Sequence, residues 1–319
     1  MSIKLDQIRA EEVIKGTSLG RDAWLRLRKN PVAMVSLFFL ILVVFLCFVF
    51  AWFCSNPNVI SLTNKFAPPS AEHWFGTDQL GRDLFSRILY GGQISLLVGF
   101  VATAVSLVIG ISYGAVAGYS GEKTDEIMMR IVDILYAIPF LVIVIILKVV
   151  VAGPIDDSAQ WTVDQLGWNK ELVMRTANIL PLFIAIGALG WLTLARITRA
   201  QVISIKNQEY VEAAVSLGLS SKRILFRHII PNTIGTAIVY ASLTIPGFIL
   251  YEASLSYLGM GVEAPNSSWG ILIKEGANFL ETQPSLLIIP GLVFSLTLFA
   301  LNFLGDGLRD AFDVRTSKD

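Results

Sequence analysis

The chain has 319 residues, of which 54% are hydrophobic and only 16% are charged, and its mean hydropathy is +0.63. One water-soluble core cannot bury that much apolar surface, so a lipid bilayer is the expected solvent. The 25 basic and 25 acidic side chains cancel, so the overall charge indicates neither nucleic acid nor an acidic substrate as a partner.

The N-terminal segment, residues 1–31, is expected to be cytoplasmic. Within it, residues 20–30 alternate apolar with basic side chains just before Pro31. This pattern suits a short amphipathic helix at the inner membrane surface. Ordinary anchoring by positive charges on the inner side explains the same residues equally well.

Six apolar stretches are long enough to cross a bilayer as helices. The first is followed by no small-residue cleavage pattern, so we expect it to be an uncleaved span rather than a signal peptide. Together the stretches define a transmembrane domain over residues 32–305. The expected spans are residues 32–53, 93–118, 131–152, 176–195, 233–257 and 283–305.

Four of these spans contain a proline, which removes a backbone donor and predicts a kink. The prolines are Pro139, Pro181, Pro246 and Pro290. The second span is rich in glycine, which predicts close packing against another helix rather than a ligand site.

The sidedness follows from the basic residues. Most of the 25 lysines and arginines lie in segments that face the cytoplasm if the N-terminus is inside. Both termini, including a tail over residues 306–319, are then cytoplasmic. Residues 54–87, 153–175 and 263–281 become outer loops, and residues 201–231 belong to one long inner loop.

This inner loop contains the segment EYVEAAVSLGLSSKRILFRHIIPN, from Glu209 to Asn232, which is far more polar than the sequence around it and must face water. Gly218 offers a break, and Ser220 or Ser221 can cap a second helix that begins near Lys222. We therefore expect two short helices, joined at a glycine, to form a knob beneath the membrane. The apolar residues on one side of its first helix are Val211, Ala214, Val215 and Leu217.

The knob also carries a motif. Glu212, Ala213, Ala214, Gly218 and Pro231 match E-A-A-x3-G-x9-I-x-L-P, the EAA motif of the membrane subunits of bacterial ABC importers. The full spacing is present. The segment therefore resembles that family.

The end of the motif resembles one branch of the family. His228 stands where the general motif has Ile, and Ile230 stands where it has Leu, which is typical of peptide importers. Three further segments resemble the C-type subunits of oligopeptide and dipeptide permeases, so the resemblance covers nearly the whole chain. They are FGTDQLGRDLFSRILYGGQISL (75–96), SYLGMGVEAPNSSWGILI (256–273) and NFLGDGLRDAFDVR (302–315).

The resemblance implies an all-α, polytopic membrane protein with six transmembrane helices and the type I ABC importer permease fold, which is MetI-like. Two features depart from the pattern. Gln93 stands where the family commonly has Arg, which puts a local charge contact in doubt. The loop over residues 153–175 is longer than expected, which indicates either a plain insertion or a surface for an outer partner.

The resemblance also implies partners in the bacterial cytoplasmic (inner) membrane. These are a homologous second permease subunit of the B type, two ATP-binding cassette subunits, and an extracytoplasmic peptide-binding protein. The sequence has no G-x4-G-K-[ST] loop, so ATP and Mg²⁺ are expected on the ATPase subunits, and this chain is expected to be no enzyme and to hold no cofactor.

In the family, the knob lies in a groove of an ATPase subunit. Carried over to this sequence, Glu212 would accept contacts from the ATPase, Gly218 would permit the bend, and the small Ala213 and Ala214 would allow close seating. His228 and Pro231 complete the set of expected coupling residues.

Two acidic residues fall within the spans. Glu252, in the outer half of the fifth span, is costly there and should face a cavity or a partner. Three roles are open: lining the peptide path, pairing with a basic group of the second subunit, or bonding the nearby backbone. Asp133, near the inner end of the third span, is expected to be an anchor or a helix-end contact.

Other functions are less well supported. A secondary transporter driven by an ion gradient would not need the knob. An intramembrane enzyme would need a nucleophile with a base, or metal ligands, inside the spans, and the spans contain no such set. His73 and His228 lie in unrelated segments, so no metal site is expected. Peptide is the preferred cargo, with nickel or a metal chelate as the alternative within the same branch.

Overall fold

The computed structural model describes residues 19–312, and this part of the chain is built from helices with no β-strand. Short turns of other helix types are η1 (Phe50–Phe53), η2 (Leu62–Asn64) and η3 (Leu225–Ile229). The α-helices are α2 (Leu19–Leu27), α3 (Pro31–Phe48), α4 (Leu84–Ser120), α5 (Glu122–Ala137), α6 (Phe140–Leu166), α7 (Lys170–Ala177), α8 (Leu180–Lys206), α9 (Glu209–Ser216), α10 (Ser221–Ile224), α11 (Ile230–Tyr257), α12 (Trp269–Ala277) and α13 (Ser285–Phe312).

Within residues 19–312, five helical segments are long and apolar enough to cross a membrane, and a sixth span is obtained if α5 and α6 count as one. These two helices are bent by 93° where they meet, so the expected third span, residues 131–152, is divided at the proline that was expected only to kink it. The cause is Pro139, which disfavours a helical conformation at the residue before it. Ile138 is accordingly extended, with φ −88° and ψ 135°.

Other boundaries differ from the expectation as well. The expected outer loop over residues 153–175 is mostly helical, because α6 continues to Leu166 and α7 begins at Lys170. The second span starts at Leu84 rather than at residue 93, because the Asp83 carboxylate accepts a hydrogen bond from the Ser86 N–H and caps the helix.

The four prolines that were expected to kink a span occupy different positions in the helices. Pro181 lies in the first turn of α8, where a missing N–H leaves no helical bond unmade. Pro139 separates two helices instead of bending one. Pro246 and Pro290 lie inside α11 and α13.

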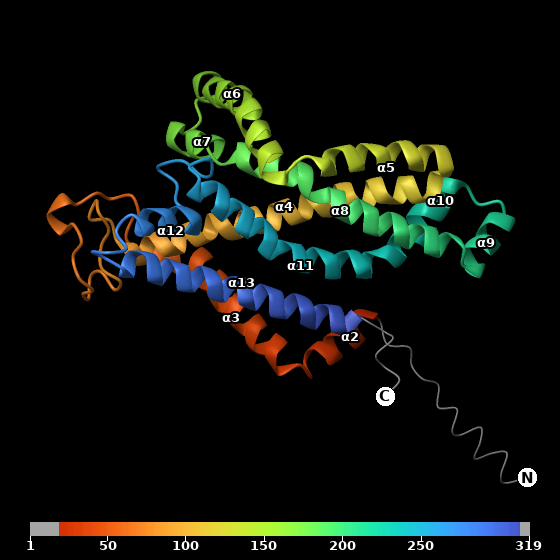
Figure 1. The fold of residues 1–319 in the computed structure, drawn as a ribbon, viewed down its shortest axis with the longest axis horizontal. Coiled ribbons are helices and arrows are strands. Elements are labelled where there is room, and N and C mark those ends of the chain that lie inside the picture. Colours follow the sequence, from red (N-terminus) through yellow and green to blue (C-terminus); the bar gives the residue numbers. More distant parts are fainter. Residues whose placement is uncertain (1–18, 313–319) are drawn as a thin grey trace, which may run out of the picture.

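The long helices form one bundle around α4 (Figure 1). α4 packs along α8 on one side and α11 on the other; α13 packs on α11, and α3 packs on α13. Glycines make the α4–α8 contact close: a Cβ at Gly114 would lie 2.3 Å from the Ala195 carbonyl oxygen, and one at Gly118 would lie 2.9 Å from the Arg199 carbonyl oxygen. The expected small-residue packing of this helix is confirmed.

The two ends of the bundle are different in kind (Figure 1). One end carries α9 and α10, together with α2 and the last turns of α13. The opposite end carries α12 and the segment over residues 54–83. This arrangement agrees with the sidedness expected from the basic residues, which stays a prediction because the structure contains no membrane.

Candidate functional site

The knob, defined here as residues 207–229, has the expected two-helix form. α9 ends at Ser216, the chain reverses at Gly218 with φ +75°, and α10 begins at Ser221. Two backbone bonds close the turn, from Gly218 N–H to the Val215 carbonyl (2.9 Å) and from Leu219 N–H to the Ala214 carbonyl (3.2 Å). A glycine is favoured here because other L-residues rarely adopt a positive φ. Ser220 is the N-cap residue of α10, but its side chain makes no capping bond.

The knob is anchored to the bundle by a small apolar cluster. Val211 and Ala214 of α9 are buried, at 1% and 5% exposure, and they pack with Ile224, Leu225 and Ile229. The same cluster includes Ala115 of α4 and Val202 of α8. The cluster therefore connects α9 with the ends of α4, α8 and α11 that lie next to the knob.

Two of the four apolar residues expected on one side of α9 do not join this cluster. Val215 is 57% exposed and Leu217 is 81% exposed. The reason is that α9 ends after two turns, so Leu217 lies beyond the helical face that packs on the bundle. These two side chains leave an apolar patch at the end of the molecule.

The sequence-predicted coupling residues lie on this knob, except Pro231, which lies in the first turn of α11 directly after it. Glu212, Ala213, Gly218 and Pro231 are exposed and His228 is partly exposed, whereas Ala214 is buried against the bundle. Within residues 19–312 the Glu212 carboxylate has neither a hydrogen bond nor an ion pair. It is therefore free to meet a group on another chain.

Tyr210 and Asn232 also shape the knob, although sequence reasoning gave them no role. The Asn232 amide donates to the His228 carbonyl (2.6 Å) and to the Tyr210 hydroxyl (3.2 Å), which ties α9 to the start of α11. The signal available in the sequence was an asparagine one turn after the knob, a residue type that bonds backbone carbonyls.

The ends of the bundle helices next to the knob are connected by charged side chains. Arg199 of α8 forms a bidentate ion pair with Asp125 of α5. Lys206 donates to the Tyr119 carbonyl of α4 at 3.1 Å. These contacts connect α4, α5 and α8 next to the knob.

Glu252 is enclosed within its own chain. Its side chain is fully buried, and it accepts hydrogen bonds from Ser95 Oγ of α4 (2.8 Å) and Ser256 Oγ of α11 (2.7 Å). The carboxyl has no exposed surface in the single chain, and its expected role in the peptide path or at the second subunit stays a prediction. Serines on two helices satisfy it, and neither serine stands out in the sequence as its partner.

A second buried polar cluster lies near the end of the bundle opposite the knob. Arg87 is 3% exposed and donates to Asp78 Oδ2 (2.7 Å) and Glu275 Oε2 (2.6 Å). Arg82 contacts the same two carboxylates, at 2.7 and 3.2 Å. The cluster joins the segment before α4 to α12, and its residues come largely from the segment Phe75–Leu96 that carried part of the resemblance.

Gln93, which stands where an arginine was expected from the resemblance, makes a contact with α3. Its amide Nε2 donates to the Cys47 carbonyl at 2.6 Å, near the end of α3. The contact that was in doubt is thus a neutral hydrogen bond. Among residues 19–312, no group of three or more His, Cys, Asp and Glu side chains is placed to hold a metal ion.

Comparison with known proteins identifies the family of this chain. Residues 110–318 match the family described as binding-protein-dependent transport system inner membrane component, and residues 18–69 match the N-terminal TM domain of oligopeptide transport permease C. The chain is 44% identical over 316 residues to the oligopeptide transport system permease protein OppC of Haemophilus influenzae, with 96% of this chain and 92% of that protein covered.

Two Bacillus subtilis proteins are similar to the same degree. The chain is 41% identical to the oligopeptide permease protein OppC, with 95% of this chain and 92% of that protein covered. It is 42% identical to the dipeptide permease protein DppC, with 96% and 90% covered. With its helical bundle, its knob and these relatives together, the chain belongs to the family of binding-protein-dependent transport system inner membrane components, as an all-α, membrane-spanning, MetI-like permease subunit of an ABC transporter.

Proposed function

We propose that this chain is one of two membrane subunits of an ATP-driven importer in the bacterial inner membrane, and that its cargo is peptide. The relatives named as oligopeptide and dipeptide permeases support the cargo. The remaining partners are a homologous second permease subunit, two ATPase subunits that bind ATP and Mg²⁺, and an outer peptide-binding protein. Both termini are on the cytoplasmic side.

The observation that carries the coupling role is the knob. Val215 and Leu217 expose apolar surface at the end of the bundle that carries α9, beyond the long apolar helices. Exposed apolar patches of this kind mark protein contacts. Glu212 stands beside this patch without an internal partner, so a groove with an apolar floor and a basic or hydrogen-bonding rim is the complementary surface.

The anchoring of the knob gives the coupling a physical route. Val211 and Ala214 pack on residues of α4, α8 and α11, so closure of the ATPase dimer around the knob moves these three helices together. ATP binding then biases two arrangements of the bundle, one open to the outside and one open to the cytoplasm.

The test is peptide uptake in vesicles that contain this chain with its co-encoded neighbours. Labelled di- and oligopeptides are supplied with the binding protein, and the vesicles hold either ATP or a non-hydrolysable analogue. We expect uptake only with ATP, and its loss in Glu212→Lys. Glu126→Lys is the matched control, because Glu126 is an exposed glutamate of α5 outside the knob and carries the same charge change.

Two outcomes would overturn parts of the proposal. Uptake that is driven by an ion gradient and does not depend on ATP would exclude an ATP-driven importer. ATP-dependent uptake of nickel or of a metal chelate, without uptake of peptides, would exclude the cargo and leave the coupling intact.

A further inference from the structure

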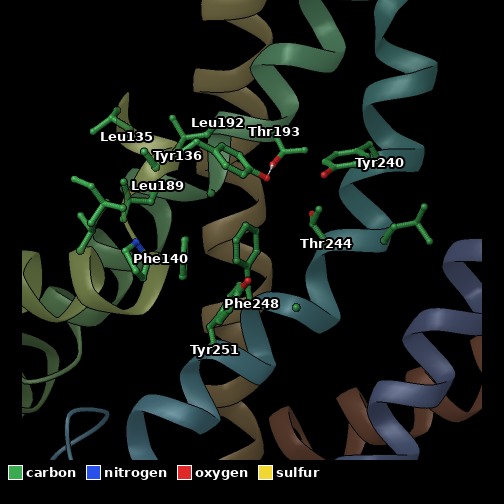
Figure 2. A pocket seen from close by; sticks show the side chains of 17 residues that line it. Leu135, Tyr136, Phe140, Leu189, Leu192, Thr193, Tyr240, Thr244, Phe248 and Tyr251 are labelled. Atoms are coloured by element: carbon green, nitrogen blue, oxygen red, sulfur yellow. Dashed lines mark hydrogen bonds between the residues drawn. The ribbon is translucent and has the colours of Figure 1, made fainter. Parts of the chain in front are cut away.

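A cavity of about 540 Å³ opens in the middle of the bundle, where α5 breaks into α6 and faces α8 and α11. Figure 2 shows its labelled side chains arranged around an open space: Tyr136 and Phe140 from the break, Thr193 from α8, and Tyr240 and Tyr251 from α11. The cavity lies at the 93° bend between α5 and α6, and residues 135–140 around the break form part of its lining.

The lining combines hydroxyl groups with aromatic rings and contains no charged residue. The Tyr136 hydroxyl and Thr193 Oγ1 lie 3.0 Å apart, and the rings of Phe140 and Tyr251 stack with their centroids 4.3 Å apart. Its hydroxyl groups come from Tyr136, Thr193, Tyr240, Thr244 and Tyr251.

The floor of the cavity requires a glycine. A Cβ on Gly190 would lie 2.4 Å from the ring of Phe248 and 2.4 Å from Ser106 Oγ, so no side chain fits there. Ser106 Oγ is buried and has no hydrogen-bond partner within residues 19–312. An unpaired hydroxyl therefore lies directly behind the floor.

The rim of the cavity toward the knob is held by paired charges. Arg196 donates to Asp133 at 2.6 Å, and its guanidinium lies 4.3 Å from the centre of the Tyr136 ring. These two residues lie about one helical turn closer to the knob than Thr193 and Tyr136 do. Asp133 is thus part of a contact between α5 and α8 rather than a helix-end anchor.

We infer that this cavity forms one wall of the path along which the cargo peptide crosses the membrane. We also infer that its side chains bind the peptide backbone rather than charged side chains of the peptide. The inference rests on the proposed function. Peptide N–H and C=O groups cannot be left unpaired away from water. Hydroxyl groups both donate and accept, so they can meet either group in a peptide of any sequence.

The aromatic rings and the absence of charge allow the cavity to accept peptides with different side chains. Tyr251 and Phe140 offer flat apolar surface to side chains of any size, and no fixed charge favours acidic or basic peptides. The wall is one-sided, because Tyr136 is 50% exposed and Tyr251 is 36% exposed in the single chain. The opposite wall therefore has to come from the second membrane subunit.

Photo-cross-linking tests the contact directly. The complete transporter is prepared with a benzophenone amino acid in place of Tyr251 and is illuminated during ATP-driven turnover with radiolabelled tri- and pentapeptides. We expect the label on this chain, with equal efficiency for acidic, basic and neutral peptides. The control carries the same amino acid at Phe299, a 60% exposed position of α13 outside the cavity, and should remain unlabelled.

A steric variant tests whether the contact matters. A Cβ on Gly247, which lines the cavity, meets no atom within 4 Å, so a larger side chain can begin there, and Gly247→Trp is designed to occupy the cavity. Gly291→Trp on α13 is the matched control, because a Cβ there also meets nothing. We expect Gly247→Trp to lose peptide uptake, the pentapeptide before the tripeptide, while ATP hydrolysis persists, and Gly291→Trp to transport normally.

Different results would contradict the proposed function and the role of the cavity. If the unmodified complex fails to import peptides, the proposed function is wrong. If it imports them while the Tyr251 probe captures only lipid or the second subunit, or while Gly247→Trp transports both peptides normally, the cavity is not the peptide wall. Capture of only one charge class would contradict backbone recognition.

Discussion

Arg87 illustrates how single residues stabilise the end of the molecule opposite the knob. Its guanidinium is almost fully buried between Asp78 and Glu275, and Arg82 shares the same two carboxylates. Two positive and two negative charges thus compensate one another at the junction of α4 and α12. Buried charges are tolerated only in such paired, hydrogen-bonded sets.

Loss of Arg87 should therefore be severe. Arg87→Met leaves Asp78 and Glu275 with one cation between them, and we expect a cost of about 3–5 kcal/mol in stability. The measurement is thermal unfolding of the purified complex in detergent. Arg87→Met combined with Glu275→Gln should lose less than the sum of the two single variants, because the excess negative charge is removed. Simple additivity would show that the cluster is not coupled.

Glu252 should behave as a structural group. Glu252→Gln keeps the volume and leaves hydrogen bonds to Ser95 and Ser256 possible, since both hydroxyls can rotate, so we expect peptide uptake to continue. Glu252→Leu removes the acceptor of both hydroxyl protons, although Ser95 Oγ still accepts from the Trp269 N–H and Ser256 Oγ still accepts from Ser268 Oγ. The variant should cost about 1–3 kcal/mol of stability. Uptake assays on the two variants, alongside thermal unfolding, decide the matter. Lost uptake in a stable Glu252→Gln protein would return the carboxylate to a transport role.

At the scale of elements, the knob was predictable and the α5–α6 break was not. Gly218, a serine pair and the alternation of apolar residues over two turns are local signals, so the two helices and their hinge followed from the sequence. Pro139 explains why the helix is interrupted at Ile138, but a proline alone does not distinguish a kink from a 93° turn. Residues 153–175 were misjudged because their polar composition suggested a loop, although they are long enough for helices.

The hinge of the knob gives a prediction of its own. Gly218→Ala should cost roughly 1–2 kcal/mol locally, because alanine is strained at φ +75° even though its Cβ meets no atom. Hydrogen exchange of the amides over residues 209–224 should then accelerate by about tenfold for each 1.4 kcal/mol.

Gly153→Ala on α6 serves as the control for the hinge variant. Its Cβ also meets nothing, but its backbone is helical, so exchange over residues 209–224 should not change. Equal exchange in the two variants would mean that the hinge at Gly218 carries no strain.

On the scale of the whole molecule, the two ends have separate tasks joined by the bundle. The knob at one end rests on α4, α8 and α11, and the same helices α8 and α11 line the central cavity. The all-α class and most of the spans could be predicted, because they depend on the length and hydropathy of local segments. The cavity and both buried polar clusters could not, because they join residues such as Arg87 and Glu275 that lie far apart in the sequence.

The most direct test of the account is whether the exposed patch of the knob transmits the energy of ATP. Peptide uptake and ATP hydrolysis are measured in the same vesicles for the unmodified transporter, for Leu217→Lys, and for Leu25→Lys as a control on α2 at the same end of the bundle. The account predicts that Leu217→Lys loses uptake while Leu25→Lys retains it. Normal uptake per ATP hydrolysed in Leu217→Lys would contradict the coupling role of the knob.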